Sequence, residues 1–232
     1  VMSWRGEKGG IEAAQQNHDV IMTPGSAGLY FDHKASASPD EPLTISGLGS
    51  GFSNFHKVYN YDPVPAVLTA EQKKYVVGVQ ANVWTEYMET PSKVEYMIFP
   101  KIYALAEIAW TPLDRKDLKN FTEERVPIHL AKLDQTTTNY WVPVPINQPE
   151  KVLNGESFSI DLKVPLTGAK IYYTLDNYRP SENATLYTKA IKVVVPQGQK
   201  KVLKTIVVTP SGKRSVVSET ILNNGAPDVK TK

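Results

Sequence analysis

The spacing of apolar residues changes near residue 146, and this change constrains the fold more than any other feature of the sequence. In the segment 90–110 they recur at helical spacing, at Val94, Met97, Ile98, Ile102, Leu105 and Ile108. Further along, apolar and polar residues alternate, as at Phe158, Ile160, Leu162 and Val164. Alternation is typical of strands with one buried face. We therefore predict an α/β domain over residues 1–142 and an all-β domain over residues 146–222.

The first domain has a strand–helix pattern typical of a parallel sheet or barrel. Short apolar runs predict strands within 19–24 and 75–84, and helices are expected over 9–17, from residue 90 and over 114–135. Pro100 should kink the second of these helices, and Pro127 fits poorly inside the third. Two or three strands cannot close a (β/α)8 barrel. We therefore expect a partial TIM barrel, and the apolar opening VMSW predicts that the natural protein continues upstream.

Three connecting or terminal segments have distinct compositions. Residues 33–65 are rich in Gly, Ser and Pro, and a long loop of this kind is expected to be a binding loop or lid unless it is a plain insertion. Residues 141–145, WVPVP, predict a stiff linker. Residues 223–232 are polar and are expected to be a disordered tail.

The second domain carries short strands separated by turns. Strands are predicted at 158–164, 171–175, 190–195, 201–208 and 215–221, with Gly- or Asn-containing turns between several of them. This spacing predicts a small immunoglobulin-like antiparallel β-sandwich.

Composition excludes several functional classes. The net charge is +2 and no Lys/Arg block stands out, which gives no case for nucleic acid. No apolar run reaches the roughly 18 residues that a membrane span needs. With no cysteine and four scattered histidines, we predict neither a metal site nor a cofactor. The sequence gives no oligomeric state.

Aromatic residues lie close to charged residues at three places, and two of these follow a predicted strand. They are Trp4 beside Arg5, Tyr30 with Asp32, and Trp84 with Glu86. In a parallel barrel functional residues lie beyond the carboxyl ends of strands, and residues i and i+2 of an extended segment point the same way. Aromatic rings and carboxylates are also what sugar sites use. The competing interpretation is that each Trp is a core residue and each acid is solvated.

Four segments resemble the second half of the barrel in the glycoside hydrolase family 20 β-N-acetylhexosaminidases. They are WRG at 4–6, YFD at 30–32, GVQANVWTE at 78–86 and FPKIYALAEIAW at 99–110. Residues 150–221, with AKIYYTLD at 169–176, resemble the small sandwich that follows the barrel in many of these enzymes. The resemblance covers nearly the whole chain, and GVQANVWTE is its most specific part.

This resemblance implies an exo-acting enzyme that removes terminal β-linked GlcNAc or GalNAc with retention, a family that departs from the two-carboxylate scheme. In the family, the substrate's acetamido oxygen is the nucleophile, an Asp orients it, and the adjacent Glu is the general acid. The motif of that pair, His-x-Gly-Gly-Asp-Glu, is missing, and Asp40-Glu41 does not match it. The resemblance therefore predicts a C-terminal fragment that is inactive alone.

The resemblance also implies a role for each matching residue. Tyr30 would donate to the acetamido oxygen, Trp4 and Trp84 would form pocket walls, and Asp32 and Glu86 would bind sugar hydroxyls. A family Trp expected after Asp32 is absent, so the pocket wall there should differ. Family members are often exported, which implies a periplasmic or secreted location.

Two other interpretations remain open. The chain could be a non-catalytic carbohydrate-binding or adhesion protein whose sandwich binds the sugar. The sandwich could instead only support the barrel. We favour this role for it because its strands carry few aromatics beyond Tyr172, Tyr178 and Tyr187.

Overall fold

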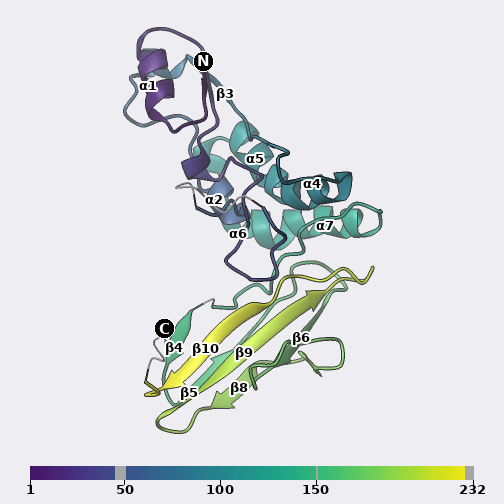
Figure 1. The fold of residues 1–232 in the computed structure, drawn as a ribbon. Helices are drawn as coiled ribbons and strands as arrows, with labels where there is room; N and C mark the ends of the chain where they lie inside the picture. Colours follow the sequence, from purple (N-terminus) through teal and green to yellow (C-terminus); the bar gives the residue numbers. More distant parts are fainter. Residues whose placement is uncertain (45–50, 150, 228–232) are drawn as a thin grey trace. The chain divides into compact units, whose positions relative to one another are not determined.

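The protein is described here from a computed structural model covering residues 1–44, 51–149 and 151–227 (Figure 1). The chain divides into two compact units. The first comprises Val1–Val126 and Thr137–Trp141, and the second comprises Pro127–Thr136 and Val142–Lys232.

The first unit is built on a three-stranded parallel sheet, in the order β1 (Met2–Ser3), β2 (Val20–Met22) and β3 (Val76–Val79). Helix α1 (Lys8–Gln15) connects β1 to β2, as a crossover between parallel strands requires. Strands β2 and β3 lie within the ranges predicted from their apolar runs, so an α/β domain with a parallel sheet is confirmed.

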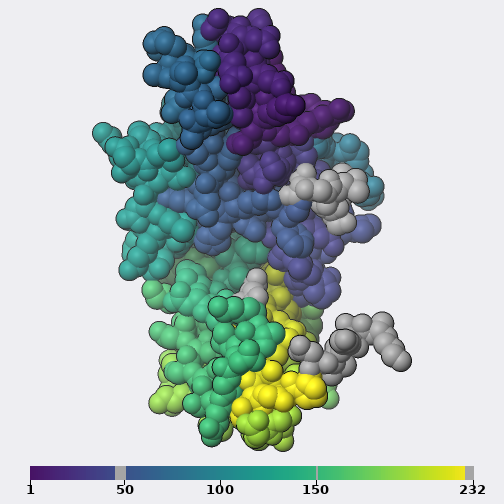
Figure 2. Space-filling view, turned by 90° about the vertical axis from the view of Figure 1, so that its left-hand side faces the viewer, coloured from purple at the N-terminus to yellow at the C-terminus, as the bar shows by residue number. Residues whose placement is uncertain are grey.

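Side chains from α1 and the sheet form a small apolar core. Ala14, Val20 and Met22 are fully buried, and Leu68 packs with them. In both views the purple N-terminal residues and the blue residues near 70 lie side by side (Figures 1 and 2). Gly10 faces this core so closely that a Cβ there would lie 2.6 Å from the Met22 sulfur, which explains why this helical position is a glycine.

Further helices of this unit are α2 (Phe55–Tyr59), α3 (Ala70–Lys73), α4 (Pro91–Ile98) and α5 (Lys101–Trp110). The first three begin after residues whose side chains cap them, whereas α5 follows Pro100 without a side-chain cap. Asn54, Thr69 and Thr90 each accept a hydrogen bond from a backbone N–H in the first turn of the helix that follows. Short 3-10 turns occur at Gly25–Ala27 and Leu113–Arg115.

Prolines divide the predicted helices differently from what we expected. Pro100 ends one helix and begins another, because Phe99 takes an extended conformation (ψ 136°) of the kind that a following proline favours. Pro127 is the second residue of α7 (Val126–Asp134), which continues directly from a π-helical turn. Before it, the predicted 114–135 helix consists of α6 (Leu118–Asn120) and a π-helical turn at Phe121–Arg125.

The second unit is a mainly antiparallel β domain. Five strands are ordered β4 (Val152–Asn154), β10 (Ser218–Asn224), β9 (Gln199–Val208), β6 (Lys170–Thr174) and β7 (Thr185–Leu186), and only the β4–β10 pairing is parallel. Strands β5 (Ser157–Ile160) and β8 (Ile191–Val194) form a separate antiparallel pair. The long strands β9 and β10 lie side by side in Figure 1.

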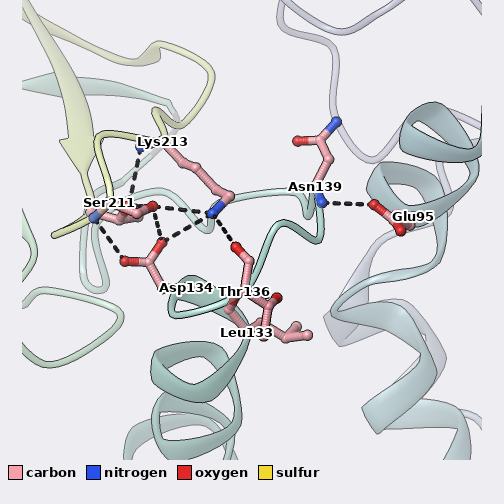
Figure 3. A network of polar contacts seen from close by, with 8 residues as sticks. Glu95, Leu133, Asp134, Thr136, Asn139, Ser211 and Lys213 are labelled. Atoms are coloured by element: carbon pink, nitrogen blue, oxygen red, sulfur yellow. Dashed lines mark hydrogen bonds and ion pairs between the residues drawn. The ribbon is translucent and has the colours of Figure 1, made fainter.

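Contacts group most of helix α7 with the β domain, whereas the sequence had grouped residues 127–136 with the α/β domain. The physical reason is the buried carboxylate of Asp134 (Figure 3). It accepts hydrogen bonds from the backbone N–H of Ser211 (3.0 Å) and from its hydroxyl (2.6 Å), and Lys213 lies 3.7 Å away. The Lys213 ammonium also donates to the carbonyl of Thr136.

Residues 137–141 belong to the first unit, and Trp141, the first residue of the predicted linker 141–145, is bonded within it. Asn139 donates its backbone N–H to Glu95 (2.8 Å; Figure 3), and Trp141 donates its backbone N–H to the carbonyl of Phe99 (3.1 Å). At the other end of the chain, strand β10 includes Asn223 and Asn224, so the first residues of the predicted tail are in a strand. Residues 228–232 lie outside the described residues, as do 45–50 of the predicted 33–65 loop.

Candidate functional site

The carboxyl ends of the three parallel strands bring the predicted site segments to one edge of the sheet. Trp4 directly follows β1, and Trp84 follows β3. Tyr30 reaches the same edge because residues 29–31 return, after the turn that follows β2, to pair with Asn82. The backbone N–H of Phe31 donates to the Asn82 carbonyl, and the Asn82 N–H donates to Leu29 (both 2.8 Å).

Three aromatic rings meet at this edge. The ring centroids of Tyr30 and Trp84 lie 4.6 Å apart, and those of Trp4 and Trp84 lie 5.5 Å apart with planes at 84°. Tilted and edge-on pairs at these distances are stabilising arrangements for aromatic rings. This arrangement agrees with the expectation from the sequence that the rings of Trp4, Tyr30 and Trp84 lie close together. Trp4 keeps 39% of its surface exposed, so part of the cluster faces solvent.

The hydroxyl of Tyr30 is held by the backbone. It donates a hydrogen bond to the carbonyl oxygen of Trp4, which also accepts the N–H of Gly25 (3.4 Å). Gly25 is needed here because a Cβ at this position would lie 2.6–2.7 Å from ring atoms of Tyr30. Burial, and then the negative charge of Asp32, raises the pKa of Tyr30, so its hydroxyl stays protonated and able to donate at neutral pH.

Asp32 is a buried carboxyl group, with only 2% of its surface exposed. Within the described part of the chain, neither of its side-chain oxygens has a hydrogen-bond partner. The Nε2 atom of His33 lies 3.8 Å from Oδ2. Burial raises the pKa of Asp32, and among nearby charges Glu86 raises it further while His33 and Lys101 lower it. An unsatisfied buried carboxylate is costly and can accept a donor from a ligand.

The second predicted acid, Glu86, has a different environment. Its side chain is exposed, whereas the ring of Trp84 two residues earlier is half-buried. The two acids therefore do not share one environment, although Glu86 is close enough to influence the ionisation of Asp32. On the outer side of the cluster, the Arg5 guanidinium lies 4.7 Å from the centroid of the Trp4 ring.

Two residues that sequence reasoning passed over belong to the surroundings of the site. Lys101 is buried at the first position of α5, and it donates to the carbonyls on either side of Asp32. Glu41 is buried in the long loop and accepts hydrogen bonds from Ser36, Tyr96 and Trp141 (2.8, 3.3 and 3.1 Å). A charged residue inside an apolar helix stripe was a signal for Lys101, but nothing in the sequence specified its partners.

Side chains that could bind a metal ion are not grouped in the described part of the chain. Across residues 1–44, 51–149 and 151–227, no three His, Cys, Asp or Glu side chains are gathered in a way that suits a metal ion. Over the same ranges, no helix has both the length and the apolar character that crossing a membrane requires.

Comparison with known families assigns both parts of the chain. Residues 1–113 match the catalytic domain of glycosyl hydrolase family 20, and residues 153–219 match the chitobiase/β-hexosaminidase C-terminal domain. The chain belongs to glycosyl hydrolase family 20. It consists of part of that catalytic domain, with a parallel sheet and helices, followed by the mainly antiparallel domain.

Similar proteins carry the same family name. The chain is 41% identical to a β-hexosaminidase of Porphyromonas gingivalis over 94% of its length, and 31% identical to one of Vibrio furnissii over 46%. It spans 27% and 17% of the lengths of those two relatives.

Solved structures of family 20 enzymes share the fold. An exo-β-N-acetylglucosaminidase of Vibrio harveyi in complex with N-acetylglucosamine matches with a TM-score of 0.54 at 31% identity, over 60% of this chain and 21% of that one. A Streptomyces plicatus N-acetyl-β-hexosaminidase in complex with thio-NAglucal matches with a TM-score of 0.52 at 26% identity, over 61% and 28%. The family 20 chain described here is therefore homologous to β-hexosaminidases.

Proposed function

We propose that the native protein carrying this family 20 chain is an exo-β-N-acetylhexosaminidase. It would remove terminal non-reducing β-linked GlcNAc or GalNAc by a substrate-assisted, retaining mechanism. The observation that carries this proposal is the meeting of three aromatic rings, with centroids 4.6 and 5.5 Å apart, beside the buried carboxyl of Asp32, whose oxygens have no hydrogen-bond partner among the described residues. An apolar wall next to a hydrogen-bond acceptor suits one face of a sugar ring and its hydroxyls.

Each of the five residues has a proposed role. Trp4 and Trp84 pack against the sugar ring and its acetamido methyl group, Asp32 and Glu86 accept hydrogen bonds from sugar hydroxyls, and Tyr30 donates to the acetamido oxygen. The raised pKa of Tyr30 supports the last role, because a phenol that stays protonated can donate throughout the neutral range. In this role the Tyr30 hydroxyl would exchange its bond to the Trp4 carbonyl for one to the substrate.

The nucleophile in this mechanism is the substrate's own acetamido oxygen. It attacks the anomeric carbon and forms a cyclic oxazolinium-like intermediate while the leaving oxygen takes a proton from a general acid. Water then opens the intermediate with the same configuration at the anomeric carbon. The His-x-Gly-Gly-Asp-Glu motif that would supply the orienting Asp and the general acid does not occur in these residues. We propose that this pair lies outside the sequence described.

The same proposal extends to the architecture. The three parallel strands would be part of a (β/α)8 barrel, whose functional residues follow strand carboxyl ends. The five- and two-stranded sheets would face each other as an immunoglobulin-like sandwich that supports the barrel. The supporting role, as opposed to sugar binding, is favoured by Tyr187, one of the few aromatic residues of this domain. Its hydroxyl donates to Asp161 of the same domain (2.8 Å). Export from the cytoplasm rests on the family resemblance alone and is tested by cell fractionation.

Hydrolysis of an aryl N-acetyl-β-glucosaminide tests the function. The native protein should release the phenol and give the β-anomer first when the reaction is followed by proton NMR, while residues 1–232 alone should be inactive. Hydrolysis only of glycosides that lack the acetamido group would refute the mechanism. Activity of residues 1–232 alone would refute the placement of the acid pair outside them.

The alternative is a carbohydrate-binding or adhesion protein without catalysis. The exposed ring of Tyr178, with 73% of its surface accessible, is the feature of the second unit that favours it. Binding of N-acetylglucosamine oligomers to the native protein, with no hydrolysis and with loss of binding in Tyr178→Ala, would support this alternative.

A further inference from the structure

We propose that Lys101 is a positioning residue for Asp32: from the start of α5 it clamps the backbone on both sides of this acid and keeps its carboxylate placed and ionised for a sugar hydroxyl. This inference rests on the proposed function, because it assumes that Asp32 contacts the substrate.

The clamp consists of two hydrogen bonds that bracket one residue. The ammonium of Lys101 donates to the carbonyl of Phe31 (2.8 Å) and to the carbonyl of His33 (3.4 Å). These carbonyls belong to the residues immediately before and after Asp32. Lys101 therefore fixes the backbone of Asp32 on both sides. The carboxyl of Asp32 has no hydrogen-bond partner among the described residues, so its position depends on this support.

Burial makes Lys101 an unusual choice for a purely structural contact. Only 4% of its surface is exposed, and taking an ammonium group out of water is expensive unless it is compensated. The compensation here comes from the two carbonyls, from the Phe31 ring, whose centroid is 4.9 Å from the ammonium nitrogen, and from the negative charge of Asp32. A Met would fill the same space without that cost.

Charge also couples the two residues. The pKa of Lys101 is lowered to about 7 because burial outweighs the charges of Asp32 and Glu41, which act in the opposite direction. In return, the charge of Lys101 lowers the pKa of Asp32, which burial has raised. A carboxylate accepts from two sugar hydroxyls, whereas a protonated acid offers less acceptor capacity. Lys101 therefore favours the form of Asp32 that binds.

The alternative is that Lys101 only stabilises the fold. Fold stabilisation alone would not change the pH at which the site ionises. Loss of the Lys101 charge should move the acid limb of kcat/KM to higher pH, because the pKa of Asp32 then rises. The groups that act on Asp32 otherwise, His33, Glu86 and Tyr30, stay in place. The pH profile therefore separates the two roles.

The test compares Lys101→Met and Lys101→Arg in the native protein, with Lys74→Met as the control. Lys74 is an exposed lysine that pairs with exposed Glu71 (2.7 Å), so its substitution should leave activity unchanged. Lys101→Met should lower kcat/KM on an aryl N-acetyl-β-glucosaminide by about 10- to 100-fold at neutral pH, the range for a misplaced binding group. The loss should shrink as pH rises, and N-acetylglucosamine binding by calorimetry should weaken in parallel.

Lys101→Arg keeps the charge, and so its acid limb should stay at the wild-type pH even where its larger head lowers kcat/KM. An unshifted acid limb in folded Lys101→Met overturns the proposal, as does a shift of equal size in both variants. If Lys101→Met does not fold, Asp32→Asn replaces it: this variant should lose the same acid limb, and a limb that persists overturns the inference. A wild-type protein that neither hydrolyses the glycoside nor binds N-acetylglucosamine contradicts the proposed function itself.

Discussion

Replacing Gly25 with alanine tests the aromatic cluster without touching any residue that is proposed to contact the sugar. Gly25 is the buried first residue of the turn Gly25–Ala27 and lies against the ring of Tyr30. A Cβ there would lie 2.6 Å from Cδ2 and 2.7 Å from Cζ of Tyr30. Ordinary van der Waals contact begins near 3.4 Å, so the ring or the turn must move by nearly an ångström.

The structure gives the size of the expected effects. The Tyr30 ring cannot move far, because it packs against Trp84 at 4.6 Å and against His33 at 5.3 Å between centroids. Overpacking of this kind costs about 1–3 kcal/mol of stability. Displacement of a substrate-positioning group by about 1 Å costs up to about 100-fold in rate. We therefore expect a folded protein with kcat/KM reduced by one to two orders of magnitude.

The assay is steady-state hydrolysis of an aryl N-acetyl-β-glucosaminide, together with urea unfolding. Gly9→Ala is the matched control, since a Cβ there meets only the Ser3 hydroxyl, at 3.7 Å. In a Tyr30→Ala background the clash disappears, so Gly25→Ala should then have almost no further effect on either measurement. Equal losses in both backgrounds, or full activity of Gly25→Ala, would refute the reasoning.

Three further substitutions test other parts of the structure. Tyr30→Phe keeps the ring contacts and removes one donor, so kcat should fall by about 10²–10³-fold with an unchanged circular dichroism spectrum; unaltered turnover would contradict the assigned role. Trp84→Ala should raise KM and weaken N-acetylglucosamine binding in calorimetry more than it lowers kcat, and an effect on kcat alone would argue against a pocket wall. Asp134→Ala removes the buried carboxylate that accepts from the Ser211 N–H and hydroxyl, and should cost about 1–3 kcal/mol in urea unfolding, whereas Glu182→Ala at an exposed pair should cost much less; similar losses in both would refute the anchoring role of Asp134.

How much of the β domain could be predicted depended on strand length. Strands β5, β6, β8, β9 and β10 overlap the predicted ranges because each carries alternating apolar residues, such as Ile171 in β6 and Leu203 in β9, that pack in a core. Strands β4 (Val152–Asn154) and β7 (Thr185–Leu186) were missed. Both are at sheet edges with mostly exposed residues, and two or three residues cannot establish a period.

The helical region shows where local rules were insufficient. A proline in an apolar stripe predicts a kink, but at Pro100 the helix is interrupted: Phe99 takes the extended conformation that a following proline favours, and its carbonyl accepts the backbone N–H of Trp141. Similarly, WVPVP predicts an exposed linker, yet the indole of Trp141 donates to buried Glu41. Both bonds of Trp141 join residues separated by tens of positions, which no local pattern reveals.

For the site, the sequence predicted the convergence of the rings but not their electrostatics. Trp4, Tyr30 and Trp84 could be placed together because parallel strands share a carboxyl edge. Spacing treated the two acids, Asp32 and Glu86, as equivalent, but the structure buries one and exposes the other. The Lys101 clamp lies about 70 residues from Asp32 in sequence, and only the fold brings the two together.

The unequal burial of the two acids has a consequence for binding. Exposed Glu86 is already hydrated, so a sugar hydroxyl that replaces water there gains little. Buried Asp32 has no hydrogen-bond donor within the described residues, and a hydroxyl that reaches it removes a desolvation cost that the fold already carries. Discrimination among sugars should therefore depend on the hydroxyl that faces Asp32, because a sugar lacking it leaves a buried carboxylate unpaired. Sequence patterns place charged side chains in solvent, so they do not predict a buried carboxylate such as Asp32 that is kept for its function.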